Sequence, residues 1–189
     1  MNGEVTLRDA VPGDEALAAR FVRALAEYEN LLHEARGTED DFRRALFGPQ
    51  PRAWALFAER AGQPVGFALW FYTFSTFAAA PGLYVEDVFV EPGQRGRGIG
   101  RMIFRDLARR ALDEGCARME WRVLTWNAPA IGFYRSIGAR PVEEWVVQRL
   151  DDAALAAFAA GKVGALPQTQ PGGFAAWTPT KGWPLEPLT

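Results

Sequence analysis

Apolar residues recur along this chain with two different spacings. Short apolar runs closed by glycine, proline or charged residues are typical of β-strands. Such runs lie at residues 4–8, 54–58, 65–71, 83–90, 119–124 and 145–150. Apolar residues at steps of three and four are typical of a helix with one buried face. Stretches with the helical pattern lie at residues 14–32, 38–47, 102–112, 127–137 and 151–160.

The order of these elements predicts the class of fold. One strand precedes two helices, three strands follow, and helices and strands then alternate. A mixed order with helical crossovers predicts an α/β fold around a mixed sheet. After residue 160 the pattern stops, and proline, glycine and tryptophan recur without a period. We therefore predict one domain over residues 1–150. A C-terminal helix and irregular tail over residues 151–189 should pack on that domain or on a second copy.

Composition narrows the class of protein. The chain has 189 residues, of which 49% are hydrophobic and 23% charged, as in a globular domain. Its net charge of -2 argues against a general nucleic-acid binder. Cys116 and His33 are the single cysteine and histidine, too few for a disulfide framework or an ordinary zinc site, so no metal is expected. There is no apolar run of ~18 residues and no secretory leader pattern, so we expect a cytoplasmic protein without a membrane partner.

The loop at residues 91–100 carries the clearest chemical signal. It lies between a predicted strand and a predicted helix, and glycine occupies positions 96, 98 and 100. Glycines let backbone amides approach a ligand, and the start of a helix adds free amides and a positive dipole end. Four arginines add positive charge: Arg95, Arg97, Arg101 and Arg105. These features predict a pyrophosphate site; the alternative is a flexible glycine turn beside a solvated basic face.

Two common phosphate motifs do not match this loop. A dinucleotide-binding motif needs a third glycine where Arg101 stands, and a P-loop needs Gly-Lys-Ser/Thr. The spacing Arg95-x-x-Gly98-x-Gly100 instead resembles the acetyl-CoA motif of the GNAT N-acetyltransferases. The resemblance continues at residues 126–134. With residues 25–29 and 38–41 it points to the spermidine/spermine (diamine) N-acetyltransferase branch, over about residues 4–150.

This resemblance implies the GNAT fold, a central mixed and mostly antiparallel sheet flanked by helices, with acetyl-CoA as co-substrate. It also implies a homodimer. Backbone contacts to the pantetheine arm are expected from the strand before the loop, and further contacts from the loop and from the helix that starts near residue 127. The candidate acetyl-CoA contacts are Val88, Phe89, Val90, Arg95, Gly96, Arg97, Gly98, Ile99, Gly100, Arg101, Asn127, Ala128, Pro129, Ala130 and Tyr134.

Two side chains are candidates for the acid and base of acetyl transfer. A lysine-like amine has a pKa of ~10.4, so neutralising it near pH 7 costs about 4–5 kcal/mol, and a general base is useful. Glu86, in the strand beside the loop, is the candidate base, directly or through water; neighbouring Asp87 should point to the opposite face. Tyr134 lies two helical turns after Asn127 and is protonated at neutral pH, so it is the candidate general acid.

Each assignment has a simpler alternative. The two acids could merely make the end of a strand polar, although acids inside an apolar strand are costly unless they are used or paired. Tyr134 could be a helix aromatic packed in the core. Asn127 could be a plain helix cap, with Pro129 in the first turn, and capping is compatible with a contact to CoA.

An amine acceptor needs spaced carboxylates that are not already paired. Glu120 and Arg122 share one face of a strand, so they could pair and cancel. The diamine acetyltransferase branch usually has other residue types at these two positions. His33 is interpreted as an exposed histidine, and Cys116 as a small buried residue without a role. The candidate acceptor contacts are Tyr28, Glu29, Glu86, Asp87, Glu120, Trp121, Arg122 and Glu144, with Glu143 as an alternative to Glu144.

These observations predict an N-acetyltransferase. It would move an acetyl group from acetyl-CoA to a primary amine of a small polyamine-like or amino-acid-like molecule, by direct transfer in a ternary complex. One alternative acceptor is a protein N-terminus or lysine. Another possibility is a module that binds acyl-CoA without catalysis, which the presence of both Glu86 and Tyr134 disfavours.

Overall fold

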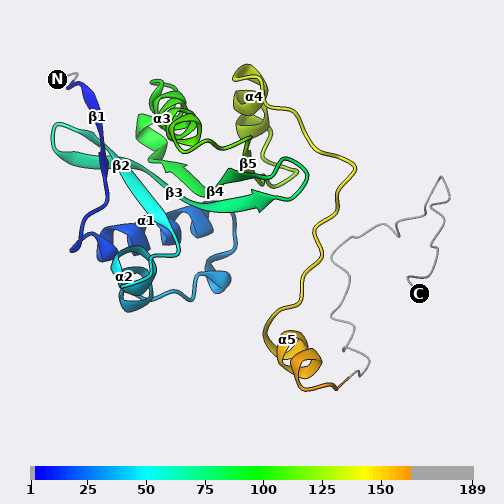
Figure 1. The fold of residues 1–189 in the computed structure, drawn as a ribbon. Helices are drawn as coiled ribbons and strands as arrows, with labels where there is room; N and C mark the ends of the chain where they lie inside the picture. Colours follow the sequence, from blue (N-terminus) through cyan, green and yellow to red (C-terminus); the bar gives the residue numbers. More distant parts are fainter. Residues whose placement is uncertain (1–2, 163–189) are drawn as a thin grey trace. The chain divides into compact units, whose positions relative to one another are not determined.

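The computed structural model describes residues 3–162 of the chain (Figure 1). The chain divides into two compact units, Met1–Arg140 and Pro141–Thr189. The first unit holds five strands and four α-helices, and its sheet has the order β1-β2-β3-β4-β5. The strands are β1 (Val5–Asp9), β2 (Trp54–Arg60), β3 (Gln63–Ser75), β4 (Ala80–Val90) and β5 (Met119–Trp121). The helices are α1 (Glu15–Tyr28), α2 (Glu39–Phe47), α3 (Ile99–Asp113) and α4 (Ala128–Ser136), with short 3-10 turns η1 (Leu32–Glu34) and η2 (Pro92–Gln94).

The sheet is mixed and mostly antiparallel, which confirms the predicted fold class. Neighbouring strands from β1 to β4 pair antiparallel, whereas β4 and β5 pair parallel. A parallel pair needs a long crossover, and α3 supplies it. Helices cover both faces of the sheet, with α1 and α2 on one side and α3 and α4 on the other (Figure 1).

Each face of the sheet has its own apolar core. On the α1 side, Phe21 contacts a cluster of aromatic rings from three strands, and its ring lies 5.7 Å from that of Phe67. On the α3 side, Ile103 and Leu107 are fully buried against Trp70 and Val85. Alternate strand positions therefore belong to different cores, because successive strand side chains point to opposite faces.

One irregularity in β4 breaks that alternation. Leu69 pairs with Asp87 and the next residue, Trp70, pairs with Val85, so Glu86 is an extra residue in β4, a β-bulge. Val85 consequently belongs to the α3-side core, while Asp87 shares the α1 side with its partner Leu69. The rule that predicted opposite faces for Glu86 and Asp87 does not apply at a bulge.

The predicted strand over residues 119–124 is shorter in the structure. The β4–β5 ladder has three pairs and ends at Val85 and Trp121, beside the bulge. Beyond this point β4 continues, and residues 122–162 form no strand. The two strands therefore part at Glu86, because the bulge ends their common register.

The predicted strand over residues 145–150 is wrong. This segment of the second unit has no regular structure, and its side chains Trp145 and Val146 are exposed. A strand forms only where a neighbouring strand pairs with it, and the apolar pattern carries no information about a partner. The predicted C-terminal helix is present as α5 (Asp152–Ala159). The tail predicted after residue 162 lies outside the described residues.

Candidate functional site

The loop between β4 and α3 presents glycine amides to solvent. Gly96 and Gly98 have φ angles of 73° and 82°, a left-handed conformation that glycine adopts without strain. Gly98 caps the N-terminus of α3, and a Cβ atom added there would meet no protein atom within 4 Å. Ile99 is buried and anchors the helix, whereas Arg97 beside it is exposed. The loop therefore exposes free amides at the positive end of α3, as an anion site requires.

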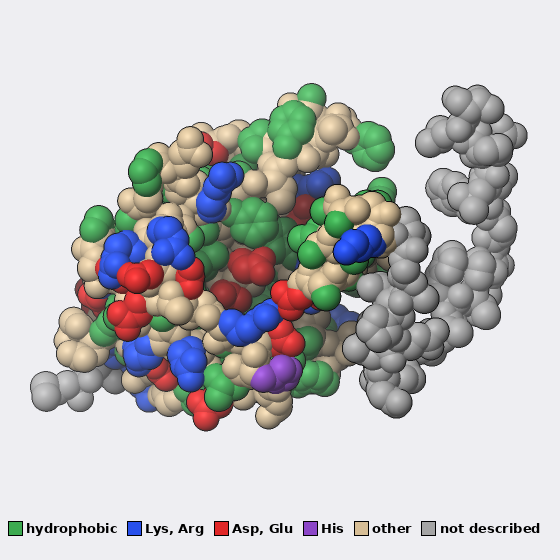
Figure 2. All heavy atoms as spheres, turned by 90° about the horizontal axis from the view of Figure 1, so that it is seen from below, with side chains coloured by type: hydrophobic (Ala, Val, Ile, Leu, Met, Phe, Trp, Pro, Cys, Tyr) green, Lys and Arg blue, Asp and Glu red, His purple; other side chains and the backbone are tan. Residues whose placement is uncertain are grey.

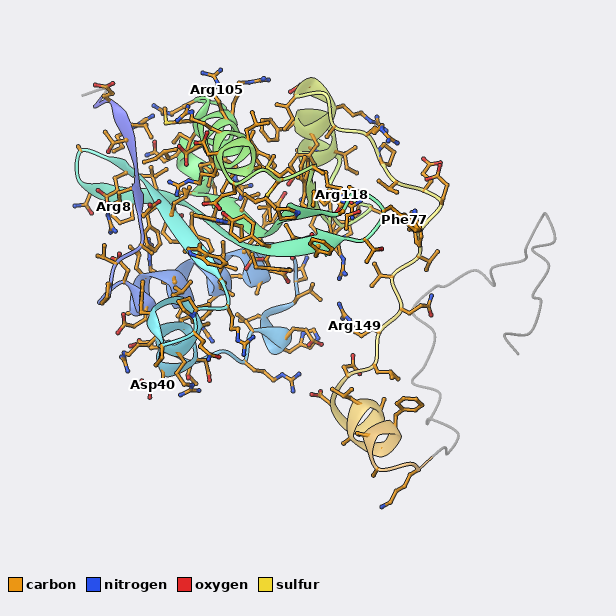
Figure 3. All side chains as sticks on the ribbon, viewed as in Figure 1. Arg8, Asp40, Phe77, Arg105, Arg118 and Arg149 are labelled. Carbon is orange, nitrogen blue, oxygen red and sulfur yellow. The ribbon has the colours of Figure 1, made fainter. Side chains whose placement is uncertain are left out.

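The arginines near this loop differ in the contacts that their side chains make. Arg105 points away from α3, as Figure 3 shows. Arg101 donates to the Ser136 hydroxyl at 2.9 Å, which links α3 to α4. Arg95 instead folds back under the loop: its Nε donates to the Val90 carbonyl oxygen at 2.9 Å.

Arg95 begins a row of contacts between three elements. Its guanidinium carbon lies 4.5 Å from the centre of the Tyr28 ring and 5.4 Å from that of Phe89. The Tyr28 hydroxyl, at the end of α1, lies 3.4 Å from Asn127 Oδ1. Asn127 is buried and also accepts from the Ala130 amide at 3.3 Å, which confirms it as the cap of α4. This row, Arg95–Tyr28–Asn127, connects the glycine loop to the start of α4.

Three carboxylates gather where β4 and β5 part. Asp87 is largely buried, and burial raises its pKa to about 6, with further contributions from the charges of Glu86 and Glu29. Burial also raises the pKa of Glu29, which directly follows α1. Among residues 3–162, none of the three has an ion-pair partner. Figure 2 shows acidic side chains recessed among apolar ones on the face seen from below. Unpaired carboxylates of this kind suit a positively charged ligand.

Tyr134, on α4, lies near one of these carboxylates, Glu29. Burial raises its pKa to about 12, and the charge of Glu29 adds to the effect. Its ring is held by Trp121 of β5, at 5.1 Å between centres, and by Phe104 of α3, at 5.4 Å. The hydroxyl is therefore a fixed proton donor that remains protonated through the neutral range.

The structure also places the remaining candidates. Glu120 forms an ion pair with Arg118 at 2.8 Å, so the predicted pairing with Arg122 is wrong. Ala128, Pro129 and Ala130 form the first turn of α4. Glu143 and Glu144 belong to the second unit and are exposed in a turn.

His33 is exposed beside Glu34, and Cys116 packs against the α3-side core, where burial raises the pKa of its thiol. His33 is therefore exposed and Cys116 packed against apolar residues, as the sequence predicted. The described residues contain no group of three acidic, histidine or cysteine side chains that could hold a metal ion. Among the described helices, none is long and apolar enough to cross a membrane.

Two aromatic residues of the candidate site could not be recognised from the sequence. The Phe104 ring packs against the Tyr134 ring, but in the sequence Phe104 is one of several apolar residues on the buried face of α3. Tyr84 stacks on Phe71 at 5.1 Å on the sheet face that holds Asp87, yet it reads as part of a continuous apolar strand. Only the position of these rings in space reveals their contribution.

Comparisons with known proteins agree with this geometry. The model of the acetyltransferase (GNAT) family matches residues 19–139. Thialysine N-epsilon-acetyltransferase of Sus scrofa is 37% identical over 148 residues, covering 74% of this chain and 86% of that protein. L-ornithine N5-acetyltransferase NATA1 of Arabidopsis thaliana is 39% identical over 93 residues, covering 49% of this chain and 41% of that protein.

A further relative and a solved structure extend the comparison. The spermidine/spermine N(1)-acetyltransferase-like protein 1 of Homo sapiens is 33% identical over 140 residues, covering 70% of this chain and 20% of that protein. An integron cassette protein from the mobile metagenome of V. cholerae has a similar structure, with a TM-score of 0.69 and 26% identity. That match covers 82% of this chain and 97% of the other.

Proposed function

The chain belongs to the acetyltransferase (GNAT) family, and we propose that it moves an acetyl group from acetyl-CoA to a primary amine of a small polyamine-like or amino-acid-like molecule. The observation that carries this proposal is the opening between β4 and β5. The glycine amides of the β4–α3 loop lie beyond one end of β4. Glu86, at the point where β4 and β5 part, shares one electrostatic neighbourhood with Asp87, Glu29 and Tyr134.

The glycine loop and the start of α4 would hold acetyl-CoA. The amides of Gly96 and Gly98, with the dipole of α3, match the charge of a pyrophosphate. Past the bulge, Val88, Phe89 and Val90 pair with β3 on one side only, so their other side is open to an amide-containing arm. Asn127, at the start of α4, and Tyr134, within α4, would border the pantetheine arm of acetyl-CoA.

The transfer itself needs one base and one proton donor. Glu86, exposed at the bulge, takes a proton from the ammonium, directly or through water, and the free nitrogen lone pair attacks the thioester carbonyl carbon. The new C–N bond forms as the C–S bond breaks, the electron pair leaves with sulfur as a thiolate, and the remaining excess proton of the attacking nitrogen passes to this thiolate. Tyr134 donates a hydrogen bond to that sulfur. Asp87 and Glu29 hold a second positive charge of the acceptor.

The homologues support this choice of acceptor. Two relatives are named for acetylation of side-chain amines of amino acids, thialysine and ornithine, and a third is named for polyamines. The proposed reaction requires one small-molecule amine as partner. That no nucleic acid and no membrane takes part stays a prediction. The homodimer and the cytoplasmic location stay predictions.

One assay tests the proposal directly. Release of free thiol from acetyl-CoA is measured with spermidine, putrescine, lysine, thialysine and short peptides as acceptors. We expect turnover with at least one small amine and little with the peptides. Turnover with peptides alone would move the function to protein acetylation. Binding of CoA without turnover on any amine would indicate a module that only binds acyl-CoA.

The loop glycines provide a second test. Gly98→Ala places a Cβ on a residue with φ of 82°, which costs roughly 1–2 kcal/mol in this conformation and favours a changed loop. We expect the affinity for CoA, measured by calorimetry, to fall by about tenfold. Gly93→Ala is the matched control, because Gly93 lies in the same loop without a positive φ, and its Cβ also meets nothing within 4 Å. Equal effects of the two variants would argue against an ordered anion loop.

A further inference from the structure

Arg122 stands at the opening between β4 and β5. The parallel register pairs Tyr84 with Glu120 and Val85 with Trp121. The next pair in this register would be Glu86 and Arg122, but the strands part there. Arg122 therefore occupies the position opposite the bulged residue that we assign as the base.

This arginine has no acidic partner among residues 3–162. Its predicted partner, Glu120, is bound by Arg118, which Figure 3 shows beside the sheet. The only interaction of the Arg122 side chain in the described structure is with Tyr84, whose ring centre lies 5.9 Å from its guanidinium carbon. Arg122 is also exposed. Its guanidinium can thus accept an incoming anion without breaking an existing ion pair.

The charges around Tyr84 show that Arg122 shares the neighbourhood of the acids. Burial raises the pKa of the Tyr84 hydroxyl, the charge of Arg122 opposes this rise, and the charges of Glu86 and Glu120 add to it. Tyr84 and Asp87 lie on the same face of the sheet, because their partners Phe71 and Leu69 are two residues apart in β3. Arg122 therefore lies near Tyr84 on the sheet face of Asp87 and close to Glu86, and neither of these two acids has an ion-pair partner among the described residues.

This combination distinguishes two kinds of acceptor. A diamine carries two positive charges, which the carboxylates attract and Arg122 repels. A diamino acid carries in addition a carboxylate, which a guanidinium binds through two parallel hydrogen bonds. Its α-ammonium remains available to Asp87 and Glu29. The charges of the site match a diamino acid more completely than a diamine.

We propose that Arg122 binds the carboxylate of the acceptor, so that the enzyme acetylates the side-chain amine of small diamino acids in preference to the corresponding diamines. This inference rests on the proposed function and names the acceptor class within it. Arg122 is then a specificity-determining residue that lies outside the acetyl-CoA loop.

Matched acceptors that differ only in the carboxylate test the proposal. Lysine is compared with cadaverine, and ornithine with putrescine, by kcat/KM for the wild type and for Arg122→Gln. We expect the wild type to prefer each amino acid. In Arg122→Gln, kcat/KM for the amino acids should fall by ~10- to 100-fold, mainly through KM, as expected for a lost hydrogen bond between charged groups. The diamines should show no fall.

Two further variants control the experiment. Arg23→Gln removes the same charge from an exposed position on α1, and it should leave the ratio between amino acid and diamine unchanged. Arg122→Lys keeps the charge without the two-pronged geometry, so it should retain part of the preference. A circular dichroism spectrum and a Tm close to those of the wild type show that Arg122→Gln is folded.

The outcomes separate this inference from the proposed function. Loss of turnover with every amine in the wild type would overturn the proposed function itself. Turnover on both acceptor classes, with a ratio that Arg122→Gln does not change, would overturn only the role of Arg122. A preference of the wild type for the diamines would also overturn it.

Discussion

Replacing Tyr134 by phenylalanine is expected to lower kcat by about 10²- to 10³-fold, the usual effect of removing one hydrogen-bond donor from a developing negative charge. The pKa of Tyr134 is raised to about 12 by burial, so the hydroxyl is protonated throughout the neutral range. A thiol has a pKa of about 8.5, so complete transfer of the tyrosine proton to the departing sulfur is unfavourable. Tyr134 therefore acts mainly as a hydrogen-bond donor to that sulfur.

The test separates the rate from binding. Steady-state kinetics should show the loss in kcat, while the affinity for CoA stays near that of the wild type, because the ring keeps its contacts with Trp121 and Phe104. Tyr72→Phe is the matched control, since the Tyr72 ring lies in β3 at 5.1 Å from that of Trp54, and the charges near it are those of Glu114 and Arg110 rather than the acids at the bulge. A Tyr134→Phe enzyme with an unchanged rate would remove this hydroxyl from the mechanism.

Replacing Asp87 by asparagine is expected to make the protein more stable and less active. Burial raises the native pKa of Asp87 to about 6, above its usual value of 3.8. A raised native pKa means that the folded state binds more protons than the unfolded state between these values, so the wild type loses stability as pH rises from about 4 to 6. At pH 8, Asp87→Asn should gain on the order of 2 kcal/mol in the free energy of unfolding, and at pH 3 almost nothing.

Urea denaturation at the two pH values measures this gain, and kinetics measure the cost in function. In the wild type, KM for the amine should rise as pH falls through about 6, and Asp87→Asn should lose this dependence. Glu86→Gln removes the same charge from the exposed neighbouring residue, so it should lower the rate without a comparable gain in stability. A less stable Asp87→Asn protein at pH 8 would show that the buried carboxylate is compensated by a partner.

Much of this fold follows from local patterns. The helix over residues 38–47 and the glycine loop before α3 are marked by residue types at fixed spacing, and the structure forms both, with a capping box between Thr38 and Asp41 at the start of α2. Such features depend on hydrogen bonds between residues close in sequence. A sequence shows these directly.

The features that could not be predicted depend on contacts between distant segments. The bulge at Glu86 arises from the register between β3 and β4, and alternation in β4 alone gives no sign of it. Either Arg118 or Arg122 could pair with Glu120, since both are two residues away, and the structure shows Arg118 as the partner. The absent strand at residues 145–150 had the right composition, but among residues 141–162, the part of its unit that the structure describes, no strand pairs with it.

The early end of the β4–β5 ladder leaves the sheet unfinished between its last two strands. Past the bulge, β4 has a neighbour on one side only, so part of this strand keeps an open edge in the element that leads into α3. A molecule that completes this edge must be slender and extended, with donors and acceptors spaced like those of a peptide. The gap therefore selects a ligand by its shape as well as by its charge. We expect the protein to become more rigid when a ligand fills the gap.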